Sequence, residues 1–256
     1  MARKRVKPQH LAEARVKDAM QLRIAAGSAV LYRGVLRRDY EALAQAYRET
    51  GEVVESAVKE SDMAKALATN WERTAKAAGG RTLMQLTSKK RYHCAIHTKG
   101  IMQDLLAREL VDYGKRWLGK KILQVSTTTI DQVRGIVQRF DGEDINTIAN
   151  QISTLGAALS GYRSMTIART ETHSIANWSS DEVAKATGDN IEKQWAATID
   201  DRTRDDHADA DGEVVKIGRM FEVGGEELEY PGDPNGSPEN VIQCRCQALY
   251  IDLDYQ

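Results

Sequence analysis

Residues 162–199 read YRSMTIARTETHSIANWSSDEVAKATGDNIEKQWAATI, and the spacing of their apolar side chains changes partway along. Up to Thr187 the apolar residues recur every three or four positions, which predicts a helix that Gly188 closes as its C-cap. From Trp195 to Ile199, Trp, Ala and Ile alternate with less apolar neighbours, as in a half-buried strand. The stretch therefore predicts a helix followed by a sheet, which is the α+β fold class.

The chain before this stretch is predicted to be mostly helical. It has no proline between Pro8 and Pro231, so helix breakers are absent from most of its length. Residues 9–78 are rich in Ala, Leu, Glu, Lys and Arg, with apolar side chains at helical spacing. This pattern indicates an amphipathic helix or a helical hairpin.

Three further helices are expected between this region and the sheet. Hydroxyl side chains at Thr127–Thr129 are expected to cap the first, which ends near Gly142. The second starts at Asp144, and the third runs from Tyr162 to Thr187.

Strand-like segments follow at Val214–Val215, Met220–Val223 and Cys244–Ile251, separated by turns rich in glycine and proline. We therefore expect a mostly helical N-terminal region followed by a small C-terminal domain of helices and a short antiparallel sheet. The expected boundaries are a basic helical region of residues 1–125 and a domain of residues 126–256, with helices in 127–187 and the sheet in 193–253.

Charge divides along the chain near the same boundary. Residues 1–125 hold 25 Lys and Arg against 13 Asp and Glu, a net charge of +12, whereas residues 126–256 hold 11 against 24, a net charge of −13. A basic region suits DNA or an acidic protein surface, because clustered like charge attracts the opposite sign. A solvated helical face is an equally good interpretation. Within the basic half, Lys89, Lys90 and Arg91 are the residues expected to make such a contact.

Composition also argues against several classes of protein. No apolar run approaches the roughly 18 residues of a membrane-spanning helix, and Met1–Arg5 leads into polar sequence rather than a signal peptide. The three cysteines, Cys94, Cys244 and Cys246, are too few and too unevenly placed for a disulfide framework. We expect a soluble protein made in a cytoplasm, without a membrane partner.

Four short motifs occur in order in the C-terminal half. They are Ile167–Thr172, Asp201–His207, Tyr230–Pro234 and a segment from Asn240 that ends in Cys244-Arg245-Cys246. Each is weak alone, but their order and spacing are specific together. Over roughly residues 125–253 the chain resembles the C-terminal domain of the phage Mu F-like family of minor head morphogenesis proteins. It departs at Gln243, since members often carry an asparagine close to the first cysteine, here Asn240.

This resemblance implies a structural minor capsid protein of a tailed bacteriophage, not an enzyme. It implies a place in the virion, in the capsid interior near the portal, after assembly in the host cytoplasm. The implied partners are the portal protein and the major capsid or scaffold protein, and the basic half adds packaged double-stranded DNA. The protein would aid head assembly and DNA packaging or ejection. The alternatives are a nucleic-acid-binding protein that acts outside the particle and a metal-dependent hydrolase.

The polar residues of the predicted helix and loop have two interpretations. Arg169, His173 and Asn177 recur every four residues and could line an active site. The favoured interpretation is a structural polar network that holds the helix against the sheet, in which arginines form paired hydrogen bonds with carboxylates. Its expected members are Arg169, Glu171, His173, Arg202 and Arg204.

A metal site is a second hypothesis for these residues. Cys244 and Cys246 would project to one face of a strand, so both sulfurs could reach one metal ion, with His207 as a third ligand. Zinc suits these ligands, and a bound zinc ion would stabilise a small domain by cross-linking it. The fourth ligand would be water, Asp205, Asp206 or Asp233. The favoured interpretation is instead two cysteines packed as small hydrophobic side chains beside a hydrogen-bonded His207.

A catalytic metal at His207, with Asp201, Asp205 and Asp206 nearby, would make the protein a hydrolase. No recognisable nucleophile motif supports this alternative, and the Asp-Arg-Thr-Arg run is typical of a turn. A second group of potential ligands, His93, Cys94 and His97, lacks acidic or cysteine partners at a diagnostic spacing, so we expect no metal there.

Overall fold

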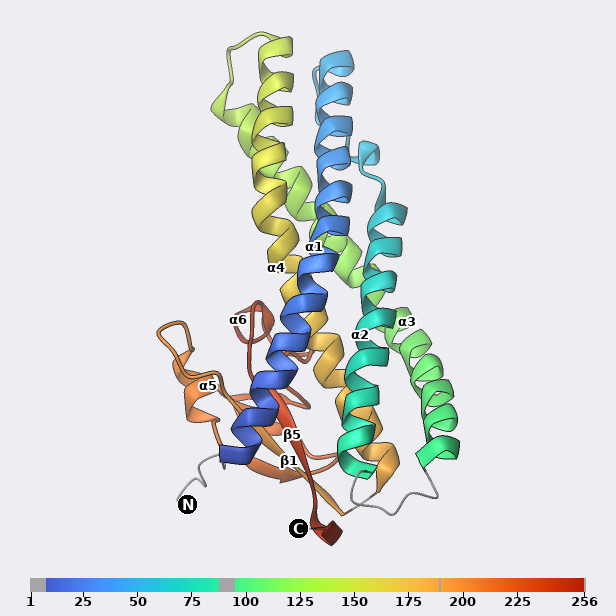
Figure 1. The fold of residues 1–256 in the computed structure, drawn as a ribbon. Coiled ribbons are helices and arrows are strands. Elements are labelled where there is room, and N and C mark those ends of the chain that lie inside the picture. The colour runs from blue at the N-terminus through green and yellow to red at the C-terminus, as the bar shows by residue number, and fades with distance from the viewer. Residues whose placement is uncertain (1–7, 88–94, 189, 256) are drawn as a thin grey trace. The chain divides into compact units, whose positions relative to one another are not determined.

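The computed structural model describes residues 8–87, 95–188 and 190–255, and it has the expected α+β architecture (Figure 1). The helical region consists of α1 (Pro8–Thr50), η1 (Glu55–Ala57), α2 (Glu60–Thr87), α3 (Ala95–Arg139) and α4 (Ile145–Thr187). The region after it consists of β1 (Ile191–Ala196), α5 (Asp205–Asp209), β2 (Val214–Lys216), β3 (Phe221–Val223), β4 (Glu226–Leu228), α6 (Pro238–Val241), β5 (Gln247–Asp252) and η2 (Leu253–Tyr255). Within the described ranges, no helix is both long and apolar enough to cross a membrane.

The expected helix start at Thr127–Thr129 is wrong, because α3 runs through these residues without a break. The hydroxyls of Thr128 and Thr129 donate to the backbone carbonyls of Gln124 and Val125, at 2.7 and 2.8 Å. A hydroxyl that bonds to the carbonyl four residues earlier is satisfied inside a helix and has no need of a capping position.

The helix start at Asp144 is confirmed. The carboxylate Oδ1 of Asp144 accepts the backbone N–H groups of Asn146 and Thr147 at 2.9 and 3.1 Å, which is the N-cap of α4. The separate helix expected from Tyr162 is a continuation of α4, which ends at Thr187 as expected. Two predicted helices are therefore one, because nothing in their connecting sequence breaks the backbone ladder.

The strands form two small antiparallel sheets, one in the order β2-β1-β5 and the other a β3-β4 hairpin. The hairpin turns at Gly224 and Gly225, whose φ angles of 58° and 79° a side chain would strain. The central strand β1 is covered on both faces, so the predicted half-buried alternation is wrong. Lys193 is fully buried opposite Tyr250, whereas Ile199, beyond the end of the strand, is 64% exposed.

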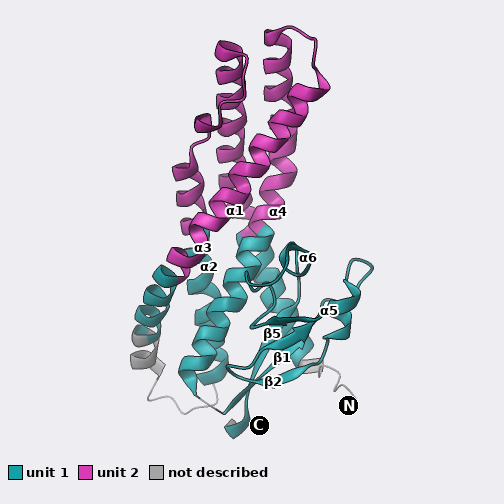
Figure 2. Cartoon of the chain, turned by 180° about the vertical axis from the view of Figure 1, so that it is seen from behind, with its two compact units in different colours: residues 1–24, 70–112, 169–256 teal, residues 25–69, 113–168 magenta. Residues whose placement is uncertain are grey.

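The chain forms two compact units, each assembled from separate segments (Figure 2). Unit 1 comprises Met1–Ile24, Asn70–Asp112 and Arg169–Gln256, and unit 2 comprises Ala25–Thr69 and Tyr113–Ala168. Each of the four long helices contributes residues to both units, so neither unit is a continuous stretch of the chain. The division at residue 125 into a basic region and a C-terminal domain stays a prediction.

Unit 2 is helical and has an apolar core. Leu36, Tyr40 and Leu43, which share one helical stripe in the sequence, are fully buried there. Gly156 permits a close approach, because a Cβ atom at this position would lie 2.4 Å from Cγ of Tyr40. The stripe therefore predicts the core of this unit correctly, while the glycine determines how closely two helices pack.

Candidate functional site

The histidine and the two cysteines predicted as metal ligands lie together in unit 1. Nδ1 of His207 lies 3.3 Å from Sγ of Cys246 and 3.6 Å from Sγ of Cys244. The three potential ligand atoms all lie within 4.8 Å of one another, and all three side chains are buried. Two sulfurs and one imidazole nitrogen are a ligand set that suits zinc.

The local backbone differs from the one expected for this group. His207 lies on α5, and the two cysteines precede β5 rather than lying in a strand, which corrects the predicted placement. Gln243 has a φ of 56°, so the chain turns sharply just before Cys244. The two sulfurs nevertheless converge on the same nitrogen atom.

Asn240, on α6, orients His207. Oδ1 of Asn240 lies 3.2 Å from Nε2 of His207, and the amide of Asn240 also hydrogen-bonds the carboxylate of Glu226. A carboxylate accepts only, so the Asn240 NH₂ faces Glu226 and its oxygen faces the histidine. Nε2 of His207 therefore donates to Asn240, and Nδ1 presents a lone pair to the sulfurs.

Apolar side chains surround the sulfurs. Trp195, Phe221 and Leu228 are fully buried in one cluster with both cysteines, and the Trp195 ring meets the His207 ring edge-on at 5.7 Å between centroids. This surrounding excludes water, which strengthens every polar interaction within it.

The two thiols have opposite pKa shifts. Burial by itself raises the pKa of Cys244, but hydrogen bonding to Cys246 and the nearby charge and hydrogen bond of His173 hold it well below its usual value. Hydrogen bonding to Cys244 and burial raise the pKa of Cys246 well above the usual value. Cys244 is therefore the sulfur that more readily carries negative charge.

None of the acidic residues considered as a fourth ligand belongs to this group. Asp205 and Asp206 are exposed. Asp233 is buried, but its two oxygens accept the backbone N–H groups of Glu229 and Asn235, each at 2.9 Å, so it shapes its own loop. His173 hydrogen-bonds Cys244 and is a further nitrogen donor beside the cluster.

The helix residues of the predicted polar network separate in the structure. Glu171 is buried and accepts the indole N–H of Trp71 at 3.1 Å. His173 is also buried, and its Nδ1 lies 3.1 Å from Oε1 of Gln21. Arg169 is exposed, which corrects its placement in a buried network. Arg169 lies just before residues 170–181 of α4, which are buried on every side, so its charge stays hydrated at the end of that buried stretch.

The loop arginines of that network make local contacts. Arg202 lies 3.7 Å from the carboxylate of Asp200 and is mostly exposed. Arg204 donates to the backbone carbonyl of Ile242 at 2.6 Å. Asp200 instead forms a two-bond pair with Arg245, at 2.5 and 2.6 Å, which sequence spacing could not indicate.

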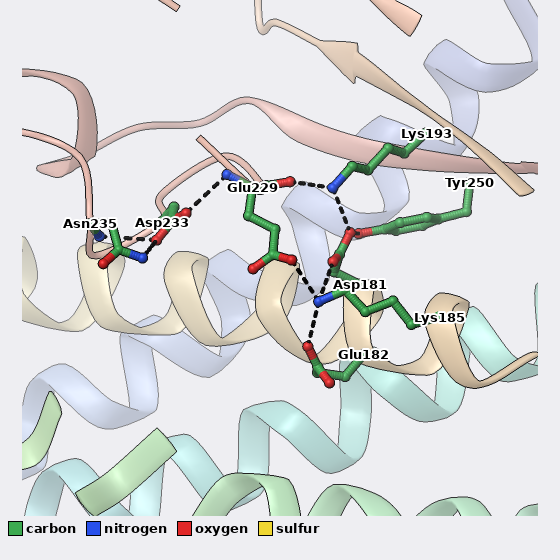
Figure 3. Close-up of polar contacts among 8 residues, drawn as sticks. All are labelled: Asp181, Glu182, Lys185, Lys193, Glu229, Asp233, Asn235 and Tyr250. Carbon is green, nitrogen blue, oxygen red and sulfur yellow. Dashed lines mark hydrogen bonds and ion pairs between the residues drawn. The ribbon is translucent and has the colours of Figure 1, made fainter. Parts of the chain in front are cut away.

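A buried ion-pair network that the sequence did not reveal connects α4 to the sheet (Figure 3). Nζ of Lys193 lies 3.2 Å from Oδ1 of Asp181, and both side chains are fully buried. The hydroxyl of Tyr250 donates to the same oxygen at 3.2 Å, and Nζ of Lys193 donates to the carbonyl of Glu229 at 2.6 Å. Burial raises the pKa of Asp181 and raises the pKa of Tyr250 well above its usual value.

Lys185 completes this network. Its Nζ lies 3.1 Å from Asp181, 2.8 Å from Glu182 and 2.7 Å from Glu229. The helical spacing between Asp181 and Lys185 was visible in the sequence, but the burial of Lys193 was not, because lysine is rarely fully buried and its partner Asp181 lies on a different element.

Two of the sequence predictions fall outside the described ranges. Lys89, Lys90 and Arg91, expected to contact DNA or an acidic partner, lie there, as do His93 and Cys94. Their contacts stay predictions.

Comparison with known proteins relates the C-terminal half to a family. Residues 131–249 match the family model described as Phage Mu protein F like protein, and this range contains both the sulfur–imidazole cluster and the ion-pair network. Over 143 residues, 54% of its length, the chain is 33% identical to a protein of Enterococcus faecalis named NAD(+)–arginine ADP-ribosyltransferase EFV. The match spans only 29% of that relative. No solved structure matches the chain. Residues 131–249, just under half of the chain, are therefore similar to the phage Mu F-like protein family, as the four motifs indicated.

Proposed function

We propose that the chain is a structural minor capsid protein of a tailed bacteriophage that supports head assembly without catalysing a reaction. The family match over residues 131–249 carries this proposal. The proposed location is the capsid interior near the portal, with the portal protein and the major capsid or scaffold protein as partners. Packaged double-stranded DNA is a further proposed contact, since residues 1–125 carry a net charge of +12.

The contacts of the buried polar groups support a rigid docking module. Asp181 and Lys193 bond each other, and Oδ1 of Asn177 accepts the backbone N–H of Ala248 at 3.1 Å. Lys17 donates to the carbonyl of Ala248 at 2.9 Å. Polar groups whose bonding capacity is used within the fold hold elements together, whereas catalytic groups need a free donor, acceptor or lone pair aimed at a substrate.

The transferase activity in the name of the Enterococcus faecalis relative is not proposed for this chain. The match accounts for 29% of that protein, so most of its length has no counterpart in the match. We expect the purified chain to leave NAD⁺ unchanged in the presence of arginine-containing acceptor proteins.

Association with particles tests the proposal directly. Proheads and mature virions would be purified on a density gradient, and the chain would be quantified against the portal and major capsid proteins by mass spectrometry. We expect a constant, low ratio to the portal protein and chemical cross-links to portal or capsid subunits. Nuclease treatment of opened particles distinguishes retention by protein from retention by DNA. Absence of the chain from both proheads and virions would contradict the proposal.

A further inference from the structure

We propose that His207, Cys244 and Cys246 bind one zinc ion that cross-links the sheet region of unit 1. This site is independent of the proposed assembly function, since a structural metal would be present whatever the protein binds.

The distances fit a zinc ion. With zinc–sulfur bonds of about 2.3 Å and zinc–nitrogen bonds of about 2.0–2.1 Å, a tetrahedral site separates sulfur from nitrogen by about 3.6 Å. The separations from Nδ1 of His207 are 3.6 Å for Cys244 and 3.3 Å for Cys246. A zinc ion could therefore be seated between these atoms with shifts of a few tenths of an ångström.

Hydrogen bonding alone accounts poorly for this arrangement. Nδ1 of His207 presents one lone pair, because Nε2 holds the ring proton toward Asn240. One lone pair accepts one S–H group, so of the two sulfurs that approach it only one can donate to it, and the other is left with the neighbouring sulfur, a weak acceptor. A metal ion between the three atoms uses the nitrogen lone pair and both sulfurs at once.

The outer contacts are those of a metal-bound histidine. The chain from Glu226 through Asn240 to Nε2 of His207 fixes the ring orientation and tautomer, as outer partners of zinc ligands do. Trp195 adds a second observation. Its buried Nε1 has no hydrogen-bond partner of ordinary geometry among the described residues, yet it lies near enough to Cys246 to favour the charged sulfur. If Cys246 binds zinc as a thiolate, this N–H group would donate a hydrogen bond to its sulfur.

Burial and location indicate a structural ion rather than a catalytic one. At most 4% of each ligand residue is exposed, whereas a catalytic zinc keeps a position open to solvent. The ion would join α5, which has five residues, to the segment between α6 and β5, and the neighbouring strands β2, β3 and β4 have only three residues each. Such elements bury little apolar area, so a cross-link contributes much of their stability. His173 lies beside Cys244, but its two ring nitrogens lie 3.1 Å from Oε1 of Gln21 and 3.2 Å from Nδ2 of Asn177, so as a fourth ligand it would have to exchange one of these contacts for the metal.

Metal content and reconstitution of the full-length chain provide the first test. Protein purified under reducing conditions should contain about one zinc per chain by elemental analysis. Removing the metal with a chelator should lower the thermal midpoint, and added Zn²⁺, but not Mg²⁺, should restore it at one equivalent. Co²⁺ should give the absorption of tetrahedral thiolate coordination. An unchanged midpoint with and without Zn²⁺ would overturn the proposal.

Single substitutions then identify the ligands. Cys246→Ser and His207→Ala should lose stoichiometric zinc, whereas Cys94→Ser, which removes the remaining cysteine, should keep it. Because the ligand variants could fail to fold, Asn240→Ala provides a milder change that should weaken zinc affinity roughly 10- to 100-fold. Full zinc content in Cys246→Ser, or its loss in Cys94→Ser, would exclude this ligand set.

Discussion

Unit 1 and unit 2 differ in what they bury. In unit 2 a stripe of Leu and Tyr side chains fills the core, with Arg163 as its buried cation. Arg163 donates to the hydroxyl oxygens of Tyr40 and Thr129, at 3.0 and 2.8 Å, and to the carbonyl of Val125 at 3.1 Å. In unit 1 the buried groups include an ion pair, two histidines and several amides. Apolar packing dominates unit 2, whereas unit 1 combines apolar clusters with a buried ion pair and other directional polar contacts, so substitutions should destabilise the two units by partly different mechanisms.

The largest effect is expected where unit 1 loses a charge partner. Lys193→Met keeps the side-chain volume but removes the buried cation 3.2 Å from Asp181. Without Lys193 the buried Asp181 would keep only the partly exposed Lys185 as a cation partner among the described residues, so its charge would be poorly compensated and the free energy of unfolding in urea should fall by about 3 kcal/mol. Lys76→Met, which removes a partner of Glu72 in an exposed pair, is the matched control and should leave the unfolding midpoint unchanged. Equal effects of the two substitutions would show that burial of the pair is unimportant.

Unit 2 should be most sensitive to volume. Gly156→Ala would place Cβ 2.4 Å from the rigid ring of Tyr40, and overpacking of this kind costs about 1–3 kcal/mol. Gly80→Ala is the control, because a Cβ there meets no atom within 4 Å. That substitution should stabilise α2 by up to about 1 kcal/mol through helix propensity. Thermal unfolding of both variants measures the difference, and stabilisation by Gly156→Ala would refute the close packing of the two helices.

A pH dependence is also expected in unit 2, and its full effect is reached only above about pH 6. Burial raises the pKa of Asp39 to about 6, against a hydrogen bond from the backbone N–H of Lys59 that lowers it. Its contribution to stability is fully present below the unfolded pKa of about 3.9 and is lost as pH rises through about 6. Asp39→Asn, which resembles the protonated form, should therefore match the wild type near pH 4 and exceed it in thermal midpoint at pH 7.5. A constant difference across this range would argue against titration of Asp39.

Local patterns predicted much of the fold and less of the site. Helical spacing identified the core stripe with Leu36 and Leu43, and the change of period near Gly188 located the boundary between α4 and the sheet. Predictions from local patterns were wrong where a residue type occurs in more than one structural setting. Thr128 and Thr129 were predicted as caps but bond backward inside α3, and the strand alternation assigned to Trp195 and Ile199 gave no indication that both faces of the strand are covered.

The sequence by itself determined that a helical region precedes a small sheet and indicated the family, because helical and strand periods and the four motifs are properties of neighbouring residues. Only the tertiary structure decided which distant groups meet. It brings His207 to both cysteines across 37 residues or more, and it buries Asp181 against Lys193. The physical reason is that burial and convergence depend on how loops close and how many layers cover a strand. Neither property leaves a periodic signal in the chain.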